Sequence, residues 1–418
     1  MRLSFGAGLG LLAAGAALLF LPGLDRAPFE RAEIYFLDAA RAMVERGDWL
    51  VPHYRGQPFF DKPALTYWLM AGAFQLAGFH PGAARLVAAA AALGAVLATV
   101  WIGVQLYDRR SALWGGLALL TTMGFMAFGR VAMSDMLLAL WCTLAFACAL
   151  ALYGGARPLP ASLGLGLALG LGFLTKGPVA LLLPGLGMLL LLARQRRLPA
   201  GGAGLALAAL VFAVVGLGWF ALLYARLGPG PLEYFFLREN VERFAGETYD
   251  SERPFWYYLP TFLTEGAPWS LLLPLAAWRL AVQRGEPNAR LLLGWMGLMA
   301  VPLSLSRGKI DYYLLPLYPA AALLVGRYLA AVPWERLDRA WARAVLLLGA
   351  LALAAAPWLA ARVPGEWLPL RTPELLGGLL LLGGAALVAA ALRATPARTG
   401  AALAAVSAAA FLAAVAAF

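Results

Sequence analysis

Long apolar runs alternate with short polar segments from one end of the chain to the other. Each run is about 18–25 residues long, which is enough for a helix to cross the hydrocarbon core of a bilayer. No small-residue cleavage site follows the first run, so we expect it to be retained as a helix rather than removed as a signal peptide. The pattern predicts an all-α polytopic membrane protein with about thirteen transmembrane helices, at residues 4–21, 84–107, 111–129, 134–153, 160–175, 178–193, 203–225, 257–278, 289–305, 311–331, 341–361, 374–392 and 400–418.

Composition and charge narrow the class of protein further. Of the 418 residues, 62% are hydrophobic and only 13% are charged, whereas a soluble domain carries about 25% charged residues. The net charge of +11 comes from basic residues scattered singly between apolar runs, without the basic stripe and interleaved aromatic residues of a nucleic-acid interface. The two Cys and two His show no disulfide or metal-ligand spacing. These features exclude a soluble or disordered chain and do not support nucleic-acid binding.

The distribution of Arg predicts the orientation of the helices, because cytoplasmic loops of membrane proteins carry an excess of Lys and Arg. If residues 63–79 crossed the membrane, everything downstream would invert, but this segment is short and carries Thr66, Tyr67 and Trp68. We therefore interpret it as an interfacial helix on the outer leaflet. The outer face then has two long loops, at residues 22–83 and 226–256. With the N-terminus in the cytoplasm, the inner loops hold Arg109, Arg110, Arg157, Arg194, Arg196, Arg197, Arg279, Arg284, Arg290, Arg336, Arg339, Arg393 and Arg398.

The predicted outer face holds the residues that could carry chemistry. All three Lys of the chain, Lys62, Lys176 and Lys309, fall on this face, each next to Gly or Pro at the end of a predicted helix. Arg130 and Arg307 lie in outer segments as well. Several cations at a lipid interface are suited to bind the phosphate of a phospholipid-like donor and to stabilise it as it leaves. The alternative is that outer loops simply tolerate charge.

Three carboxylates are candidates for a general base that accepts a proton from an acceptor hydroxyl. Glu30 and Glu33 share one side of a predicted amphipathic helix, the side that should face the membrane domain. The alternative is that these acids occupy a first turn in which the helix dipole stabilises negative charge. Asp135 is the third candidate. Asp61, directly before Lys62 in an aromatic and Pro-rich setting, could hold a metal or a phosphate head group.

Several short strings, taken in their order along the chain, resemble one known family. Over about residues 1–330 the chain is similar to the integral-membrane glycosyltransferases of the dolichyl-phosphate-mannose–protein mannosyltransferase and aminoarabinose (lipid A) transferase type. The last three predicted spans carry no motif of that family. The matching strings are Gly47-Asp48-Trp49-Leu50-Val51-Pro52, Phe60-Asp61-Lys62-Pro63, Thr175-Lys176-Gly177-Pro178, Pro254-Phe255-Trp256-Tyr257-Tyr258-Leu259-Pro260 and Leu305-Ser306-Arg307-Gly308-Lys309.

The resemblance implies a type C glycosyltransferase fold, with amphipathic juxtamembrane helices in the first outer loop, in a module covering residues 1–331. It implies inverting transfer of a sugar from a polyprenyl-phosphate donor of the undecaprenyl-phosphate kind to a lipid, glycan or protein acceptor, on the outer face of a bacterial-type cytoplasmic membrane. Residues 332–418 are expected to add three transmembrane helices and no soluble domain. The alternative is a transporter or flippase of lipid-linked sugars, but such proteins tend to show internal repeats and ionisable residues near the bilayer midplane.

The resemblance also implies a base for the reaction. The family carries an Asp-Glu pair in the first outer loop, with the Asp as the base. Aligned from Gly47 without gaps, that pair falls on Ala32 and Glu33, so the Asp is missing and Glu33 matches the Glu. Glu30, one helical turn earlier, could substitute for it. Asp135 matches a second acidic position of the family.

Further roles follow for the cations and aromatic residues. Asp61 and Lys62 match an acid-Lys-Pro motif whose acid lies near a metal or the donor phosphate. A divalent metal is left open, with Asp61 as the candidate ligand, because Tyr312 stands where related proteins often have His. The residues expected to neutralise the donor phosphate are Lys62, Lys176, Arg130, Arg307 and Lys309, and those expected near the substrate or a metal are Tyr312, Tyr257 and Trp256.

Overall fold

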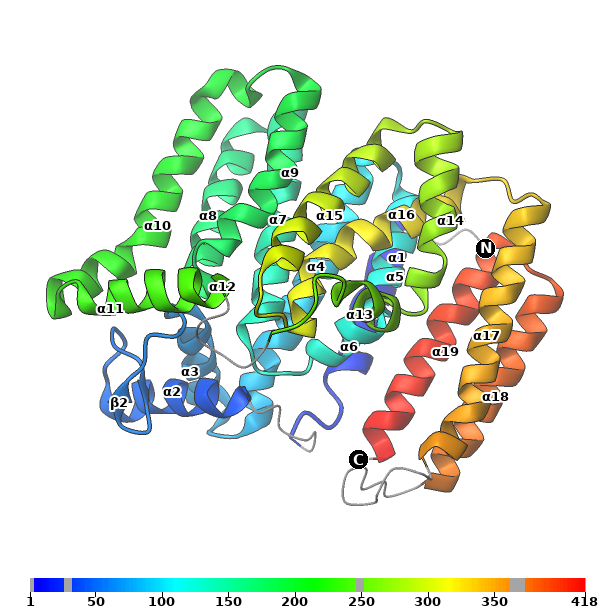
Figure 1. The fold of residues 1–418 in the computed structure, drawn as a ribbon, viewed down its shortest axis with the longest axis horizontal. Coiled ribbons are helices and arrows are strands. Elements are labelled where there is room, and N and C mark those ends of the chain that lie inside the picture. Colours follow the sequence, from blue (N-terminus) through cyan, green and yellow to red (C-terminus); the bar gives the residue numbers. More distant parts are fainter. Residues whose placement is uncertain (1–3, 26–31, 156, 246–251, 361–372, 418) are drawn as a thin grey trace.

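The computed structural model describes residues 4–25, 32–155, 157–245, 252–360 and 373–417. Long helices stand side by side across the molecule, and short helices lie across one end of them (Figure 1). The described residues contain a single small sheet, a two-stranded hairpin. The all-α membrane architecture predicted from the apolar runs is thereby confirmed.

Eight helices in the described part of the chain are long and apolar enough to cross a membrane. Three further apolar helices are shorter: α1 (Phe5–Phe20), α9 (Val179–Gln195) and the segment Leu380–Leu392 of α18 (Pro373–Leu392). The predicted number of thirteen spans is therefore not confirmed. The eight long helices are α4 (Pro81–Leu106), α7 (Ser134–Gly154), α8 (Pro158–Lys176), α10 (Ala203–Leu227), α15 (Pro287–Leu305), the continuous pair η5 (Asp311–Leu317) and α16 (Tyr318–Ala331), α17 (Arg336–Ala360) and α19 (Pro396–Ala417).

Two of the predicted spans are interrupted. Residues 111–129 form α5 (Arg109–Leu120) and α6 (Met123–Phe128), because the hydroxyls of Thr121 and Thr122 donate to carbonyls one turn back and the chain turns there. Residues 257–278 are divided where Pro lacks the N–H that a continuous helix needs. They form α13 (Tyr258–Glu265), η3 (Trp269–Leu271), α14 (Leu273–Ala277) and the start of η4 (Trp278–Gln283). The two breaks meet, since the Met123 amide donates to the Ala267 carbonyl at 3.0 Å.

The segments that carry the candidate chemistry gather at one end of the bundle (Figure 1). The first long loop contains α2 (Glu33–Arg46), the hairpin of β1 (His53–Tyr54) and β2 (Gln57–Pro58), and α3 (Leu65–Ala77). Helix α3 lies beside α2, and the rings of Phe36 and Tyr67 are 5.6 Å apart between them. The second long loop contributes α11 (Gly230–Glu233), the π-helical η2 (Tyr234–Glu242) and α12 (Arg243–Ala245) at the same end. The juxtamembrane helices predicted in the first loop are confirmed.

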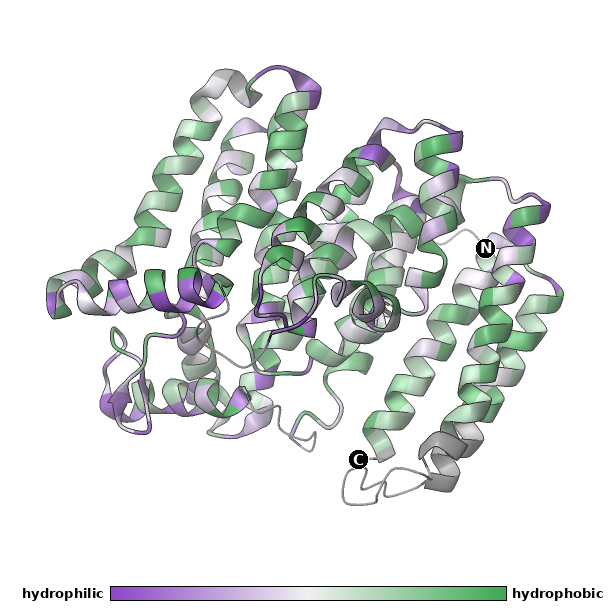
Figure 2. Ribbon diagram, viewed as in Figure 1, coloured by the Kyte–Doolittle hydropathy of each residue, from purple (hydrophilic) through white to green (hydrophobic). Residues whose placement is uncertain are grey.

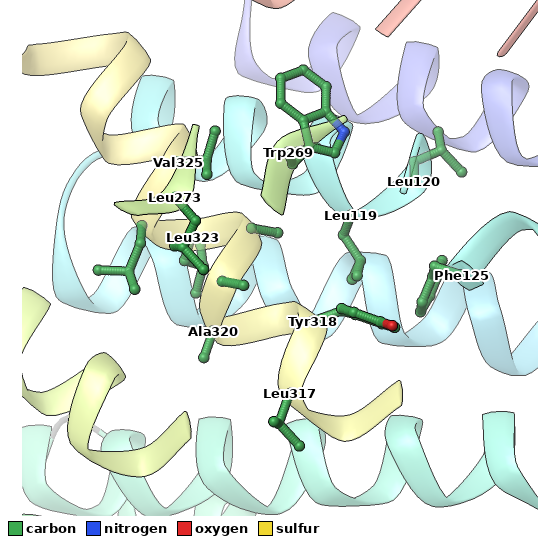
Figure 3. Close-up of a cluster of buried hydrophobic side chains, with 14 of the residues drawn as sticks. Leu119, Leu120, Phe125, Trp269, Leu273, Leu317, Tyr318, Ala320, Leu323 and Val325 are labelled. Atoms are coloured by element: carbon green, nitrogen blue, oxygen red, sulfur yellow. The ribbon is translucent and has the colours of Figure 1, made fainter. Parts of the chain in front are cut away.

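The core between the long helices is apolar and closely packed. Leu119, Phe125, Leu317 and Tyr318 belong to the cluster that joins α5, α6 and α16 (Figure 3). The Trp269 indole in this cluster donates to Thr121 Oγ1 at 3.1 Å, which satisfies its buried N–H. This buried core fixes the positions of the ends of α7 and α8, where the candidate residues Asp135 and Lys176 lie.

Hydrophilic residues lie mainly at the two ends of the long helices, whereas apolar residues cover their length (Figure 2). At the end opposite α2 and α3, the turn between α9 and α10 contains Arg196 and Arg197. The three C-terminal helices α17, α18 and α19 stand together in Figure 1. A buried ion pair of 3.2 Å between Arg279 and Asp338 joins α17 to the rest of the bundle.

Candidate functional site

A cavity of about 760 Å³ lies where the short helices meet the long ones. Most of its wall is apolar, supplied by the start of α9, by α7 and by the aromatic residues of η2. Its charged wall consists of Asp61 and Lys62 from the first long loop, Lys176 at the end of α8, and Glu239 and Arg243 from the second long loop. A cavity that is apolar on most sides and charged at one end suits an amphipathic ligand.

One cluster of charged side chains in the cavity wall joins the two long loops. Lys62 Nζ lies 3.3 Å from Glu239 Oε2, and Arg243 donates to the same oxygen at 3.1 Å. The other end of the Arg243 guanidinium donates to the Tyr313 hydroxyl at 3.0 Å. Two cations thus share one carboxylate oxygen.

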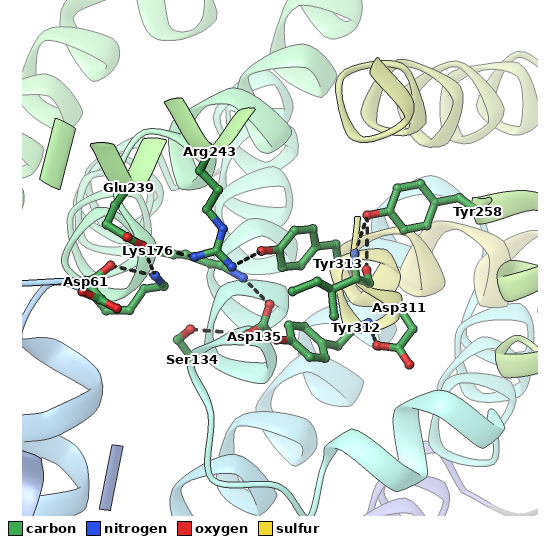
Figure 4. Close-up of polar contacts among 12 residues, drawn as sticks. Asp61, Ser134, Asp135, Lys176, Glu239, Arg243, Tyr258, Asp311, Tyr312 and Tyr313 are labelled. Atoms are coloured by element: carbon green, nitrogen blue, oxygen red, sulfur yellow. Dashed lines mark hydrogen bonds and ion pairs between the residues drawn. The ribbon is translucent and has the colours of Figure 1, made fainter. Parts of the chain in front are cut away.

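A second charged pair lies next to it. Lys176 donates to the carboxylate of Asp135, the second residue of α7. The ammonium group also lies 4.3 Å from the centre of the Tyr313 ring and 5.8 Å from that of Tyr312, within the range of cation–π attraction. Figure 4 shows these side chains converging from the ends of several helices and loops.

Burial shifts the pKa of both charged groups, Asp61 and Lys62, that come from the first long loop. Burial, and then the charge of Arg243, lower the pKa of Lys62 to about 8. Burial, and then the charge of Glu239, raise the pKa of Asp61. The Tyr234 hydroxyl donates to Asp61 Oδ1 at 2.9 Å and partly offsets that rise. An anion arriving beside Lys62 would favour its charged form again.

Glu33 is not part of this cavity. Its carboxylate forms a two-point ion pair with Arg85 of α4, at 2.8 and 2.7 Å, and both side chains are almost completely buried. The same carboxylate accepts from the Ala132 amide at 2.7 Å. These partners hold α2 against α4 and against the turn that leads into Asp135. The other predicted base, Glu30, lies outside the described residues.

Three of the predicted phosphate-binding cations also lie elsewhere. Arg130 donates to the carbonyls of Leu19 and Phe20, both at 3.0 Å, and so caps the end of α1. Lys309 is buried, and its ammonium donates to the carbonyls of Arg253 and Ser306. Arg307 is exposed, 3.9 Å from Glu252.

Among the predicted aromatic residues, Tyr312 lies nearest to the charged wall, since it faces Lys176 and packs on Phe128 at 5.6 Å. Tyr257 packs against the ring of Tyr258, whose hydroxyl donates to the Ile310 carbonyl at 3.2 Å, and Trp256 is exposed. Tyr257 and Trp256 do not line the cavity.

The structure adds residues that the motifs did not identify, namely Glu239, Arg243, Tyr234 and Tyr313. One signal was available: Glu239 and Arg243 are spaced i, i+4, which allows an ion pair on a helix. The same segment contains other charges with equal claims, so this spacing alone could not have singled them out.

The donor set does not fit a metal centre built from several protein ligands. Among the residues that the structure describes, no group of three or more His, Cys, Asp or Glu is arranged to hold a metal ion. Asp61, the predicted ligand, has the hydroxyl of Tyr234 as its side-chain partner. The site's chemistry is therefore derived from its cations, carboxylates and hydroxyls.

Comparisons with solved structures identify the fold. The fold matches ArnT from Cupriavidus metallidurans bound to undecaprenyl phosphate with a TM-score of 0.81 and 24% identity, over 98% of this chain and 76% of that chain. It matches arabinosyltransferase EmbB from Mycobacterium smegmatis with a TM-score of 0.58 and 18% identity, over 99% of this chain and 41% of that one. This is the fold of the type C integral-membrane glycosyltransferases, as the sequence predicted.

Sequence relatives then define the family. Residues 61–219 match the model of the dolichyl-phosphate-mannose-protein mannosyltransferase family. The undecaprenyl phosphate-α-4-amino-4-deoxy-L-arabinose arabinosyl transferase of Pectobacterium atrosepticum is 32% identical over 398 residues, 90% of this chain and 70% of the relative. Transferase 1 of that name from Sodalis glossinidius is 37% identical over 339 residues, 78% of this chain and 60% of the relative. The chain belongs to this arabinosyl transferase family and spans about 60% of the length of several such relatives. The resemblance inferred from the motifs is confirmed.

Proposed function

We propose that the chain is an inverting glycosyltransferase that moves a sugar from an undecaprenyl-phosphate donor to an acceptor hydroxyl at the outer face of the cytoplasmic membrane. The relatives' names suggest 4-amino-4-deoxy-L-arabinose as the sugar. The acceptor is a lipid, a glycan or a protein side chain. The observation that carries the proposal is the convergence of Lys62, Lys176 and Arg243 at the charged end of a mostly apolar cavity.

The three cations suit the change in charge that the reaction produces. The donor phosphodiester carries one negative charge, and breaking the bond between the sugar and the phosphate leaves a phosphate monoester with additional negative charge. Fixed cations in a partly buried site stabilise that developing charge more strongly than water does. The apolar wall of η2 and α9 is suited to the start of the prenyl chain.

Asp135 is the base that we propose, because of the two predicted carboxylates that the structure describes, Glu33 and Asp135, it is the one that contacts a cation of the cavity wall. The acceptor oxygen attacks the anomeric carbon from the side opposite the phosphate, the sugar–phosphate bond breaks, and the acceptor proton passes to Asp135. Lys176, which donates to the carboxylate, holds it in place. Single displacement of this kind inverts the anomeric centre.

The distribution of charge supports the proposed orientation. The Arg-rich turns lie at the end of the bundle opposite α2 and α3, as expected for cytoplasmic loops. The cavity and its cations would then face outward, where a donor already translocated across the membrane is available. A transporter is less well supported, because hydrophilic residues lie mainly at the two ends of the long helices rather than near their middle.

A transfer assay tests the proposal. The full chain in lipid nanodiscs receives undecaprenyl-phosphate 4-amino-4-deoxy-L-arabinose together with lipid A, an oligosaccharide or a Ser/Thr peptide, and mass spectrometry follows the products. We expect one acceptor to gain the sugar with inverted configuration while undecaprenyl phosphate is released. Retention of configuration, or absence of both transfer and binding of the donor, would contradict the proposal.

A further inference from the structure

A second cavity, an apolar groove of about 490 Å³, runs along α9 toward the end of the bundle opposite α2 and α3. Its wall comes from the end of α7, from α9, from η1 (Pro199–Gly202) and from the start of α10. Leu182, Gly185 and Leu189 line it from one face of α9. Helix α10 packs mainly along α8, and Leu182 and Leu189 are exposed. The groove is therefore open to the surrounding lipid.

The length of the groove matches one leaflet of a bilayer. From Leu182 to Leu192, both of which line it, α9 rises about 15 Å. This is half of the hydrocarbon core, which is about 30 Å thick. Leu182 also lines the charged cavity, so the groove begins where that cavity ends. In the orientation proposed above, the groove then lies in the inner leaflet.

The far end of the groove is positively charged. Leu198, which lines it, follows directly after Arg196 and Arg197. Arg197 donates to the carbonyl of Tyr153, another residue of the wall, at 3.5 Å, and its other N–H donors remain for a ligand. Both arginines are exposed, and in the part of the chain that the structure describes neither forms an ion pair with a carboxylate. Figure 2 shows this turn as hydrophilic between two apolar helices.

The neighbouring charges already have partners. Arg194 donates to the side-chain carbonyl of Asn288 at 2.8 Å. Glu286 and Asp108 both pair with Arg327, at 3.1 and 2.9 Å. The two arginines of the turn are thus the cations at this end that an external anion can reach without breaking an ion pair.

We propose that the groove binds one anionic phospholipid of the inner leaflet, with an acyl chain along α9 and the phosphate at Arg196 and Arg197. Basic residues at the cytoplasmic ends of membrane helices attract anionic head groups, and an apolar cavity of this size suits one chain. The donor's prenyl chain carries no charge at that depth and would leave both arginines without a partner. Binding of the phospholipid is separate from sugar transfer and shares with the proposed function only the orientation of the chain.

The test compares two phospholipids that differ only in the head group. The full chain in detergent micelles is titrated with dioleoyl phosphatidylglycerol, which is anionic, and with dioleoyl phosphatidylethanolamine, which is zwitterionic. Native mass spectrometry gives the dissociation constant of each. We expect phosphatidylglycerol to bind about 10- to 30-fold more tightly, because each Arg beside an anionic head group strengthens binding about fivefold.

Paired variants separate the turn from the general attraction of basic loops for anionic lipid. Arg196→Gln/Arg197→Gln should lower the preference below about threefold. Arg109→Gln/Arg110→Gln is the matched control, because it removes two exposed arginines from another turn and neither of them lines the groove. In this control we expect the preference of the unaltered chain.

A third variant tests the apolar part of the site. A side chain at Gly185 would meet open space, so Gly185→Leu should fill the groove without disturbing the packing of α9. It should weaken both phospholipids about tenfold, since each methylene group kept from an apolar site costs about fourfold in affinity. Gly297→Leu is the control, because Gly297 on α15 faces equally open space outside the groove. Undecaprenyl phosphate should bind Gly185→Leu within about threefold of the unaltered chain.

Three results would overturn the proposal. The first is equal binding of the two phospholipids by the unaltered chain. The second is an equal loss of preference in the two arginine variants, which would mean attraction by surrounding lipid only. The third is a Gly185→Leu variant that loses undecaprenyl phosphate rather than phosphatidylglycerol, which would assign the groove to the prenyl chain. If Gly185→Leu does not fold, the two arginine variants decide the matter alone. Each result leaves the glycosyltransferase proposal standing, since the transfer assay tests that separately.

Discussion

The chain contains two kinds of buried ion pair, and they differ in how completely their charges are satisfied. Between α2 and α4, the Glu33 carboxylate receives two bonds from Arg85 and one from the Ala132 amide, and its side chain has no exposed surface. At the cavity, Lys62 and Lys176 each make a single ion pair and remain partly accessible, with side chains 13% and 11% exposed. The first pair is closed to any ligand, whereas the second group can exchange partners with one.

The position of a carboxylate at the start of α2, beside the membrane domain, is therefore not enough to identify it as the catalytic base. The two-point geometry of Glu33 and Arg85 is that of a structural link between helices. The ion pairs beside the cavity each consist of a single contact, and the cavity itself has a volume of about 760 Å³. The number of hydrogen-bond partners, rather than burial alone, distinguishes the structural pair of Glu33 and Arg85 from the charged groups of the cavity.

The largest expected effect is at the buried ion pair of Glu33 and Arg85. Arg85→Leu leaves the Glu33 charge buried without its partner, so we expect the free energy of unfolding to fall by about 3–5 kcal/mol. Denaturant titration in mixed micelles measures this change. Arg226→Ala is the matched control, because Arg226 forms an exposed pair with Asp48 at 3.0 Å and should cost less than about 1 kcal/mol.

The double variant Glu33→Gln/Arg85→Met sharpens the same comparison. Gln keeps an acceptor for the Ala132 amide and Met fills the space of the Arg stem, so most of the lost stability should return. A folded double variant that still transfers sugar would exclude Glu33 as the base. Loss of transfer in a variant as stable as the unaltered chain would instead return Glu33 to that role.

The next largest effect is expected at the two ion pairs beside the cavity, those of Lys62 and Lys176. Lys176→Gln and Lys62→Gln each remove one cation that we propose stabilises the leaving phosphate, and each should lower the rate of transfer about 10²- to 10³-fold. Steady-state rates in nanodiscs, taken beside the unfolding midpoint of each variant, measure this effect. A rate within a few-fold of the unaltered chain would remove that lysine from phosphate stabilisation.

The pH dependence should show the lowered pKa of Lys62. Since this pKa is about 8 in the folded chain, the ammonium is present below that pH and is lost above it. Affinity for the donor phosphate should therefore fall up to about tenfold per pH unit above 8. Stability should change in the opposite direction between pH 8 and the higher pKa of the unfolded chain, because the unfolded state then binds more protons. Lys62→Arg should move the loss of affinity to higher pH.

The smallest effect is expected for Lys309. Its ammonium holds the carbonyls of Arg253 and Ser306 rather than facing the cavity. Lys309→Met should therefore lower the rate only about tenfold or less, through the position of the loop rather than the stabilisation of charge. A loss as large as that of Lys176→Gln, with the donor affinity falling equally, would place Lys309 among the phosphate-binding cations.

Much of the fold and part of the site could be predicted from the sequence. Apolar runs of helical length predict the long helices, and short motifs predict Asp61, Lys62, Asp135 and Lys176, which the structure brings together. Motifs succeed there because Asp135 and Lys176 lie at the ends of α7 and α8, and because Asp61 and Lys62 lie in the bend that leads into α3. The breaks in the spans at 111–129 and 257–278 were not predicted, because Pro also lies inside unbroken helices of this chain, as Pro184 does in α9 and Pro302 in α15. The contact between the two breaks is visible only in the structure.

The rest of the site depends on contacts between distant segments. Glu33 and Arg85 are 52 residues apart, and Lys62 and Glu239 are 177 residues apart. Neither separation leaves a local pattern in the sequence. Glu33 and Glu239 are both acids on helices with one apolar side, yet only the packing of the whole chain decides which is closed by a partner and which faces the cavity.

The most direct measurement is an experimental structure of the full chain with undecaprenyl phosphate bound. We predict that the phosphate lies within hydrogen-bond distance of at least two of Lys62, Lys176 and Arg243, while the pair of Glu33 and Arg85 stays as it is. A phosphate bound by Arg130 or Lys309 instead, or a Glu33 carboxylate released from Arg85 toward the ligand, would contradict the account.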